Sequence, residues 1–222
     1  MERIIEPELM MDDEQCRVYA YADFGQPHSR FVELFQETCG SLPAGSRVLD
    51  LGCGPGDVTI RFARAFPGCT IHGLDGSPAM LRYGRELLDA APDVSGRIAL
   101  FLGTLPALPL PQARYDAIIS NSLLHHLHDP AVLWEALPRC AASGAPVYVM
   151  DLMRPPTIEE AERLCATYSA DEPELLQKDY YNSLLAAFEP DEIRSQLESA
   201  GLWHFTVKPV SDRHLLVSGR MP

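Results

Sequence analysis

Short, almost uninterrupted apolar runs alternate with longer stretches of helical periodicity between residues 46 and 151. The apolar runs predict strands at residues 47–51, 69–75, 97–103, 115–121 and 146–152. Strands that are apolar on both faces are typical of a parallel sheet with helices packed on each side. The alternation of strand and helix therefore predicts a doubly wound α/β sheet, in which right-handed crossovers join parallel strands.

Two of the predicted helices carry start signals. Ser77 suits an N-cap, and Pro78 suits the first position of a helix. Asp129 and Pro130 repeat this pattern, and Pro138 should end or kink the helix that follows. An apolar stripe at helical spacing runs behind the first cap, at Met80, Gly84, Leu87, Leu88 and Ala91. These signals predict one helix after the second strand and another after the fourth.

The rest of the chain divides into further parts. An amphipathic helix at 28–39 indicates an N-terminal helical cap over residues 1–43, ahead of an α/β core at 44–152. Helical segments follow at about 157–169, 173–187 and 190–200, and two β-rich runs separated by Ser211 and Asp212 predict a terminal antiparallel hairpin. Residues 153–189 are too long for a simple connection, so we expect a helical insertion or lid there. The final helix and hairpin, at 190–222, are expected to complete the core.

Composition and charge indicate which class of molecule this protein binds. Hydrophobic residues make up 46% and charged residues 22% of the chain, the balance of an ordinary globular protein. The formal net charge is −13, and there is no basic run. Nucleic-acid affinity comes largely from Lys and Arg side chains that neutralise phosphates. A DNA or RNA partner is therefore disfavoured, and a small-molecule substrate is favoured.

The sequence predicts a cytoplasmic protein. The six cysteines are scattered without a C-x-x-C pair, which is typical of reduced, mostly buried thiols. The N-terminal residues are charged and acidic, and they lack the apolar core of a secretory signal. No apolar run approaches the roughly 20 residues of a membrane-spanning helix, so no membrane association is expected. Exposed apolar faces on the terminal helices are compatible with a homodimer.

A glycine-rich loop follows the first predicted strand directly. In "VLDLGCGPGD", residues 48–57, the glycines at Gly52, Gly54 and Gly56 alternate with other residues. Ligands of open α/β sheets bind at the carboxyl ends of the strands, where the next helix directs free N–H groups toward the loop. The dinucleotide motif G-x-G-x-x-G needs a third glycine where this chain has Asp57. A carboxylate beside a pyrophosphate would be repulsive, which disfavours NAD.

Two acidic residues suit a different ligand. Asp75 closes the second predicted strand, where a carboxylate can accept two hydrogen bonds from a ribose diol. Asp50 lies at the mouth of the glycine loop, where it could attract an ammonium group. A ligand with a ribose, a cationic amine and a carboxylate therefore suits this site better than a diphosphate.

These motifs resemble those of a known enzyme family. "VLDLGCGPG" and "GLDGSPAML" are similar to the first two signature motifs of class I S-adenosylmethionine-dependent methyltransferases of the type 11/12/25-like kind. "YDAIISNSLLHHLHDPAVLWEAL" resembles the family's fourth-strand motif with the helix behind it, and "SGAPVYVMD" resembles its fifth strand. The resemblance covers about residues 44–152 and the terminal hairpin. It implies a Rossmann-like, mostly parallel seven-stranded sheet, with S-adenosylmethionine (SAM) as cofactor and S-adenosylhomocysteine (SAH) as product.

The resemblance also implies which residues hold the cofactor. Asp50 and the glycine loop would surround the methionine part of SAM, and Asp75 would hold the ribose hydroxyls. Asn121 would lie at the methyl-donor end, and Cys53 would be a small apolar filler rather than a nucleophile. The family's usual acid after the third strand is replaced by Thr104, a departure at the adenine contact. The full set implied is Asp50, Gly52, Cys53, Gly54, Asp75, Gly76, Ser77, Met80, Gly103, Thr104, Leu105 and Asn121.

The segment "LLHHLHDP" holds three histidines and an acid. His125, His126, His128 and Asp129 have the donor types that several divalent ions prefer. Adjacent side chains diverge, however, and Asp129 is explained as a helix cap, so no metal site is expected. His125 or His126 is a candidate catalytic base, because the pKa of histidine lies near working pH. A packed or hydrogen-bonded structural histidine is the alternative.

Two pairs of tyrosines are candidates for substrate contacts. In "YAYADF", Tyr19 and Tyr21 either pack a docked N-terminal helix or close over the cofactor and grip a substrate. Tyr180 and Tyr181 lie within the expected insertion and leave the same alternatives open. A tyrosine in such a place can stack on a ring or orient a substrate atom.

The leading hypothesis is a SAM-dependent methyltransferase that transfers a methyl group to a small-molecule acceptor by in-line displacement. Such a reaction depends on positioning more than on a strong base. One alternative is an enzyme that uses SAM for decarboxylation or cyclisation instead of methylation. Another is a non-catalytic regulatory protein that binds SAM or a nucleoside. An NAD oxidoreductase is disfavoured by Asp57.

Overall fold

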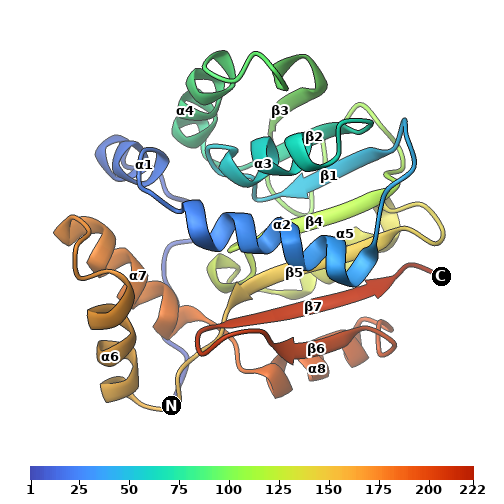
Figure 1. Cartoon of the computed structure of the whole chain (residues 1–222). Coiled ribbons are helices and arrows are strands. Elements are labelled where there is room, and N and C mark those ends of the chain that lie inside the picture. Colours follow the sequence, from blue (N-terminus) through green and yellow to red (C-terminus); the bar gives the residue numbers. More distant parts are fainter.

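The computed structural model describes residues 1–222, which form a seven-stranded sheet flanked by helices (Figure 1). The strands are β1 (Arg47–Leu51), β2 (Thr70–Asp75), β3 (Ile98–Leu102), β4 (Ala117–Asn121), β5 (Pro146–Leu152), β6 (Thr206–Pro209) and β7 (His214–Arg220). Their order is β3-β2-β1-β4-β5-β7-β6. Strands β1 to β5 pair in parallel, whereas β7 is antiparallel to both β5 and β6. This topology confirms the doubly wound, mostly parallel sheet with its terminal hairpin.

Helices cover both faces of the sheet. They are α1 (Asp13–Ala20), α2 (Gly25–Cys39), α3 (Asp57–Ala65), α4 (Pro78–Asp89), α5 (Ala131–Cys140), α6 (Ile158–Tyr168), α7 (Glu174–Ala186) and α8 (Pro190–Ser199). Short 3₁₀ turns, η1 (Ser95–Arg97) and η2 (Leu124–His126), precede β3 and α5. None of the helices has the length and apolarity that crossing a membrane requires.

Each face of the sheet has its own hydrophobic core. On one face, α2 and α3 pack on the central strands, where the Phe35 ring lies 4.9 Å from Phe62 and 5.3 Å from Tyr148. On the other face, α5 and α8 contribute the buried Trp134 and Ile193 to a second cluster. Helix α2 therefore belongs to the cover of the sheet, although the sequence placed it in a separate N-terminal cap.

One of the two predicted helix starts is confirmed, and the other helix starts one residue later than predicted. The Ser77 hydroxyl accepts a hydrogen bond from the Met80 N–H, and Pro78 is the first residue of α4. Helix α5 begins at Ala131, whose N–H donates to Asp129 Oδ1, so it starts one residue later than the pattern indicated. Helix α5 continues past Pro138 to Cys140, so Pro138 does not end the helix, which was one of the two outcomes expected for it.

The remaining segments gather beyond the carboxyl ends of the parallel strands. Helix α1 packs Cys16 and Ala20 against Met80 and Tyr83 of α4. Helices α6 and α7 pair with each other at one side of the sheet, below α1 in the view of Figure 1. The first residues of the chain run along α7, where the Ile4 N–H donates to the carbonyl of Leu185. These segments frame the edge of the sheet where the glycine loop lies.

Candidate active site

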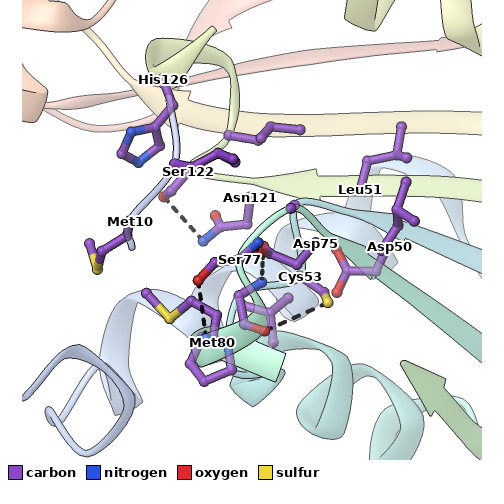
Figure 2. Close-up of a pocket in the computed structure, with 18 of the residues that line it drawn as sticks. Met10, Asp50, Leu51, Cys53, Asp75, Ser77, Met80, Asn121, Ser122 and His126 are labelled. Atoms are coloured by element: carbon purple, nitrogen blue, oxygen red, sulfur yellow. Dashed lines mark hydrogen bonds between the residues drawn. The ribbon is translucent and has the colours of Figure 1, made fainter. Parts of the chain in front are cut away.

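Two adjoining cavities open at the carboxyl ends of the parallel strands. The first, which we call the glycine-loop cavity, has a volume of about 410 Å³ and is lined by the loops after β1, β2, β3 and β4 (Figure 2). The second, the α7 cavity, has a volume of about 320 Å³ and is lined from α1, η2, β5, α6, α7 and β7. Both are lined by Leu9, Met10, Tyr19, Phe24, His28, Asn121, Ser122 and His126. These shared residues form the boundary between them.

The glycine loop needs its glycines for two different reasons. Gly52, Gly54 and Gly56 all have positive φ, at 70°, 53° and 84°, a region that favours glycine. A Cβ at Gly52 would also lie 2.8 Å from the Cβ of Leu123, so a side chain there would clash. A Cβ at Gly54 would meet no atom within 4 Å, which leaves the backbone of this residue open to the cavity.

Asp75, at the end of β2, is held by backbone donors. Its Oδ2 accepts from the Gly54 N–H and its Oδ1 from the Ser77 N–H, both at 2.8 Å. Burial raises the pKa of this carboxyl, and these hydrogen bonds partly offset the effect. Each carboxylate oxygen keeps a further lone pair. Asp75 can therefore accept additional hydrogen bonds from a ligand in the glycine-loop cavity, which it lines.

Asp50 lies deeper in the same cavity. It is 1% exposed, and its Oδ2 accepts a hydrogen bond of 2.6 Å from the Thr59 hydroxyl. Burial raises the pKa of Asp50 to about 7, although Thr59 opposes the shift. A buried carboxylate with one neutral partner lacks a counter-charge, so a ligand ammonium at this position would be stabilised.

Asn121 ends β4 at the boundary between the two cavities. Its amide nitrogen donates to the Ser122 hydroxyl at 3.2 Å, whereas its buried Oδ1 has no hydrogen-bond partner. Ser122 is the sole residue other than glycine with positive φ, at 56°. In the view of Figure 2, Asn121 lies between His126 and Asp75. The unpaired oxygen is an acceptor that a ligand could satisfy.

The loops after β2 and β3 form one wall of the glycine-loop cavity. Gly76, Met80 and Leu105 line it, and a Cβ at Gly76 would lie 2.5 Å from Leu9 and 2.9 Å from the Thr104 methyl group. Gly103 is fixed by a hydrogen bond from its N–H to the carbonyl of Asp75. This wall is largely apolar, as a flat aromatic ligand requires.

Two polar residues of the loop are fixed by the protein itself. Cys53 is buried, and burial raises the pKa of its thiol well above the usual value, so it is not a poised nucleophile. Burial also raises the pKa of Asp57, but hydrogen bonds from His28 and Arg61 outweigh it and lower that pKa to about 2. Because these two partners offset the charge of Asp57, its repulsion of a pyrophosphate is weaker than the sequence argument assumed.

His125 is held by a buried hydrogen bond to Asp151 at the floor of the α7 cavity. Its Nδ1 lies 2.5 Å from Asp151 Oδ1, and its Nε2 lies 3.6 Å from Glu6 Oε1. Burial lowers the pKa of His125, but the charge of Asp151 and this hydrogen bond outweigh it and raise the pKa. Asp151 also accepts from the Leu124 N–H. The pair is oriented in the way that a histidine base requires.

His126 has the opposite character. Burial and the neighbouring His125 lower its pKa to about 3, so it is neutral near pH 7. Its buried Nδ1 lies 3.3 Å from Glu6 Oε1 without forming a hydrogen bond. A neutral imidazole nitrogen of this kind can accept a hydrogen bond from a ligand.

Glu6, His125 and His126 also bring metal-ligand atoms within 4.8 Å of one another. The expectation that adjacent side chains diverge is therefore wrong for the two histidines, whose rings stack at 4.2 Å with a tilt of 36°. His128 and Asp129 take no part in this group: His128 binds the carbonyl of Glu6, and Asp129 caps α5.

The four candidate tyrosines separate into two pairs. Tyr19 lines both cavities, and Tyr180 lines the α7 cavity with a buried hydroxyl that has no partner. Tyr21 is 56% exposed and donates to Glu86 outside the cavities, because α1 ends at Ala20 and turns it away from Tyr19. Tyr181 lines neither cavity, because it follows Tyr180 on α7 and points to another face of the helix. Tyr21 and Tyr181 therefore lie outside both cavities, away from the place expected for substrate contacts.

Comparisons with known proteins agree with this geometry. Residues 48–146 match the family model described as "Methyltransferase domain". A trans-aconitate 2-methyltransferase of Paracidovorax citrulli is 37% identical over 119 residues, which are 54% of this chain and 42% of that protein. A trans-aconitate 2-methyltransferase of Acidovorax sp. is 33% identical over 178 residues, 75% of this chain and 65% of that protein. The chain spans about half the length of the curated relatives it matches.

A solved structure shows that the fold is shared along the whole chain. A SAM-dependent methyltransferase from Aquifex aeolicus superposes with a TM-score of 0.69 at 17% identity, over 96% of this chain and 100% of that one. Residues 48–146 form a methyltransferase domain, and the fold of the chain is that of a SAM-dependent methyltransferase. SAM is the cofactor of this family.

The methyltransferase site contains residues that the sequence argument missed. Glu6 and Asp151, which flank His125, come from the N-terminal segment and from the end of β5. Leu9 and Met10 cover the boundary of the two cavities from the same N-terminal segment. Asp151 follows an apolar strand as Asp75 does, and that position was a usable signal. Nothing in the first ten residues indicated that they reach the site.

Proposed function

We propose that this protein transfers a methyl group from SAM to a small-molecule acceptor. The observation that carries the proposal is the pair of adjoining cavities at the carboxyl ends of the parallel strands, with Asn121 between them. In this proposal SAM occupies the glycine-loop cavity and the acceptor occupies the α7 cavity. Ligands of open α/β sheets bind at this edge, where the strand order reverses.

Residues of the glycine-loop cavity fit the parts of SAM by their chemistry. Asp75 would accept hydrogen bonds from the ribose hydroxyls, and Asp50 would meet the ammonium of the methionine part. The open backbone at Gly54 would lie against the cofactor, and the unpaired Oδ1 of Asn121 would gain a partner. Gly52, Cys53, Gly76, Ser77, Met80, Gly103, Thr104 and Leu105 would complete the walls. The Thr104 side chain replaces an acid, so an apolar contact is proposed for this part of the adenine.

The chemistry that SAM supplies is a methyl group on a positively charged sulfur, which leaves as a neutral thioether. The residues of this chain then act by positioning, which can supply roughly 7–11 kcal/mol of the barrier. Leu9, Met10 and Tyr19 cover the junction of the cavities and would exclude water from it. Helices α6 and α7 and the N-terminal residues would act as the lid over the acceptor.

Two histidines are the candidates for handling a proton of the acceptor. His125, oriented by Asp151, would take the proton, and Glu6 would stabilise the imidazolium that results. His126, with its unpartnered Nδ1, would accept a hydrogen bond from the acceptor and so orient it. Tyr19 and Tyr180, which both line the α7 cavity, would contact the acceptor.

Location and partners are part of the same proposal. A small-molecule substrate and a cytoplasmic location are supported by the scattered, unpaired cysteines, and a net charge of −13 argues against a nucleic-acid partner. The named relatives act on trans-aconitate. Trans-aconitate is therefore the first acceptor to test.

The experiment is a turnover assay that measures SAH released from SAM. The purified chain would be supplied with trans-aconitate and with a panel of small amines, alcohols and thiols. Acceptor-dependent release of SAH, with a methylated product identified by mass spectrometry, is expected. A His125→Asn variant should lower kcat more than it raises KM and should remove an ionisation from the pH profile. SAM binding without turnover of any acceptor would favour the non-catalytic alternative.

A further inference from the structure

On the proposed function, the α7 cavity holds the acceptor. Most of the charged side chains that line this cavity are negative. The carboxylate residues Glu6, Asp23, Glu172 and Asp179 line it, and Arg213 is its single guanidinium or ammonium residue. A trans-aconitate acceptor would bring further carboxylates into this cavity. Like charges in a partly buried site repel more strongly than they do in water.

Arg213 is already used by the protein. Its guanidinium carbon lies 3.3 Å from the centroid of the Tyr168 ring, and its Nη1 donates to Asp212 at 3.3 Å. Tyr168 donates to the same aspartate, which locks the arrangement. The side chain of Arg213 is only 15% exposed. Asp212 therefore offsets the charge of this guanidinium, and one of its five N–H groups is already engaged.

The histidines of the cavity do not supply a free positive charge. Burial lowers the pKa of His126 to about 3 and that of His214 to about 4, so both are neutral near pH 7. His125 is paired with Asp151, and His28 lies 2.7 Å from Asp57. Their partners offset any charge that these two imidazoles carry.

Two of the carboxylates, by contrast, have only neutral hydrogen-bond donors. Asp179 accepts from the Gln15 amide at 2.9 Å, and Glu6 accepts from the Ser183 hydroxyl at 3.0 Å. Burial raises the pKa of both carboxyls. His125, whose Nε2 lies 3.6 Å from Glu6 Oε1, and the Ser183 hydrogen bond lower the pKa of Glu6, whereas the charge of Asp179 raises it. A cation placed between them would remove this unfavourable charge. Tyr19, Phe24, Tyr168 and Tyr180 add aromatic rings, which attract cations to their faces.

We propose that the acceptor carries a positively charged amino group, which Asp179 and Glu6 hold inside the α7 cavity. The cationic group is the recognised part of the acceptor and need not be the atom that is methylated. This acceptor class differs from the polycarboxylate named for the relatives. In this proposal the charges that select the acceptor, Glu6 and Asp179, lie outside the α/β core at residues 44–152.

The test uses three probes of one shape and different charge: tyramine, 4-hydroxyphenethyl alcohol and 4-hydroxyphenylacetate. Each is titrated by calorimetry into the full-length chain saturated with SAH. Tyramine is expected to bind about tenfold more tightly than the alcohol, and the acid more weakly than either. An acid that binds as well as tyramine, or the absence of binding by all three at millimolar concentration, overturns the proposal.

Matched variants separate the cavity charge from the overall charge. Asp179→Asn should lower tyramine affinity about tenfold and leave affinity for the alcohol unchanged. Asp171→Asn makes the same change at an exposed residue outside the cavity and should alter neither. Glu6→Gln provides a second test if Asp179→Asn does not fold. Equal tyramine affinity in wild type and Asp179→Asn contradicts the proposal.

SAH affinity is measured first in every sample, so that the two proposals fail separately. No SAH binding by the wild type would reject the cofactor cavity itself. Normal SAH binding without a preference for tyramine would reject only the amino-group acceptor.

Discussion

The two cavities differ in how the chain builds them. The glycine-loop cavity is made mostly from loops that directly follow consecutive strands, so each of its motifs is a short continuous stretch. The α7 cavity is assembled from the first residues, α1, the end of β5, α6, α7 and the start of β7. A site of the first kind can be predicted from the sequence, because strand order alone brings its loops together. A site of the second kind depends on helix packing that no short motif records.

The largest expected effect is at Gly52, where positive φ and a close contact with Leu123 occur together. In a Gly52→Ala variant, alanine would have to adopt the positive φ of this position, at a cost of about 1–2 kcal/mol. Its Cβ would also clash with Leu123. We expect SAH affinity, measured by calorimetry, to fall by about a hundredfold or more. Gly144→Ala is the matched control, since Gly144 also has positive φ but has no atom within 4 Å. Equal SAH affinity in the two variants would contradict the steric argument.

Asp75→Asn should have the next largest effect on the same cavity. The amide keeps one acceptor oxygen, so it cannot accept from both Gly54 and Ser77 and still bind a ribose diol. A lost hydrogen bond to a charged group costs about 1.5–3 kcal/mol, which corresponds to a tenfold to hundredfold loss of SAH affinity. Acceptor-probe binding in the α7 cavity should change much less. An unchanged SAH affinity would remove Asp75 from the cofactor site.

Asp50 gives a pH-dependent prediction. Its pKa is about 7 in the folded chain and about 3.9 in an unfolded chain, so between these values the folded protein binds more protons. Its contribution to the free energy of unfolding is therefore present below about pH 4 and is lost as the pH rises through 7. Asp50→Asn keeps the hydrogen bond from Thr59 and should flatten this part of the Tm profile between pH 5 and 8, measured by thermal denaturation.

The same substitution should weaken SAH binding above pH 7, because the ligand ammonium would lose its counter-charge. A variant that binds SAH like the wild type at pH 8 would place the ammonium elsewhere. A Tm profile identical to that of the wild type would show that Asp50 has no raised pKa.

The smallest predicted effect separates the tyrosines of α1. Tyr19→Phe removes the hydroxyl of a half-buried side chain that lines both cavities, where burial raises the pKa of Tyr19 to about 12. This change should lower kcat/KM severalfold. Tyr21→Phe removes only an exposed hydrogen bond to Glu86 and should leave kcat/KM within about twofold, since exposed substitutions usually cost less than 0.5 kcal/mol. A larger loss in Tyr21→Phe than in Tyr19→Phe would reverse the assignment.

The sequence predicted the sheet well for a physical reason. Strands such as Val48–Leu51 and Pro146–Leu152 are apolar on both faces, which only a covered parallel sheet explains. The cap at Ser77 and the glycine loop were equally readable, because each acts through local backbone geometry. The end of α5 could not be predicted from the sequence, because packing of the buried face of this helix continues it past Pro138.

The candidate site was predicted best where its residues lie at the carboxyl ends of strands. Asp50, Asp75 and Asn121 lie in the glycine-loop cavity as expected from their positions. Glu6 reaches His125 from the far N-terminus, and no pattern links two residues so far apart in the chain. Tyr180 and Tyr181 show why the sequence could not place every site residue. They are neighbours in sequence, and only the orientation of α7 decides which one lines a cavity.

The most direct test of the central claim is a crystal structure of the chain with SAH. The claim predicts SAH in the glycine-loop cavity, with its ribose hydroxyls on Asp75, its ammonium at Asp50 and its sulfur directed past Asn121 toward the α7 cavity. SAH bound elsewhere, or bound with its sulfur directed away from the α7 cavity, would contradict the account of a donor site and an acceptor site that meet at Asn121.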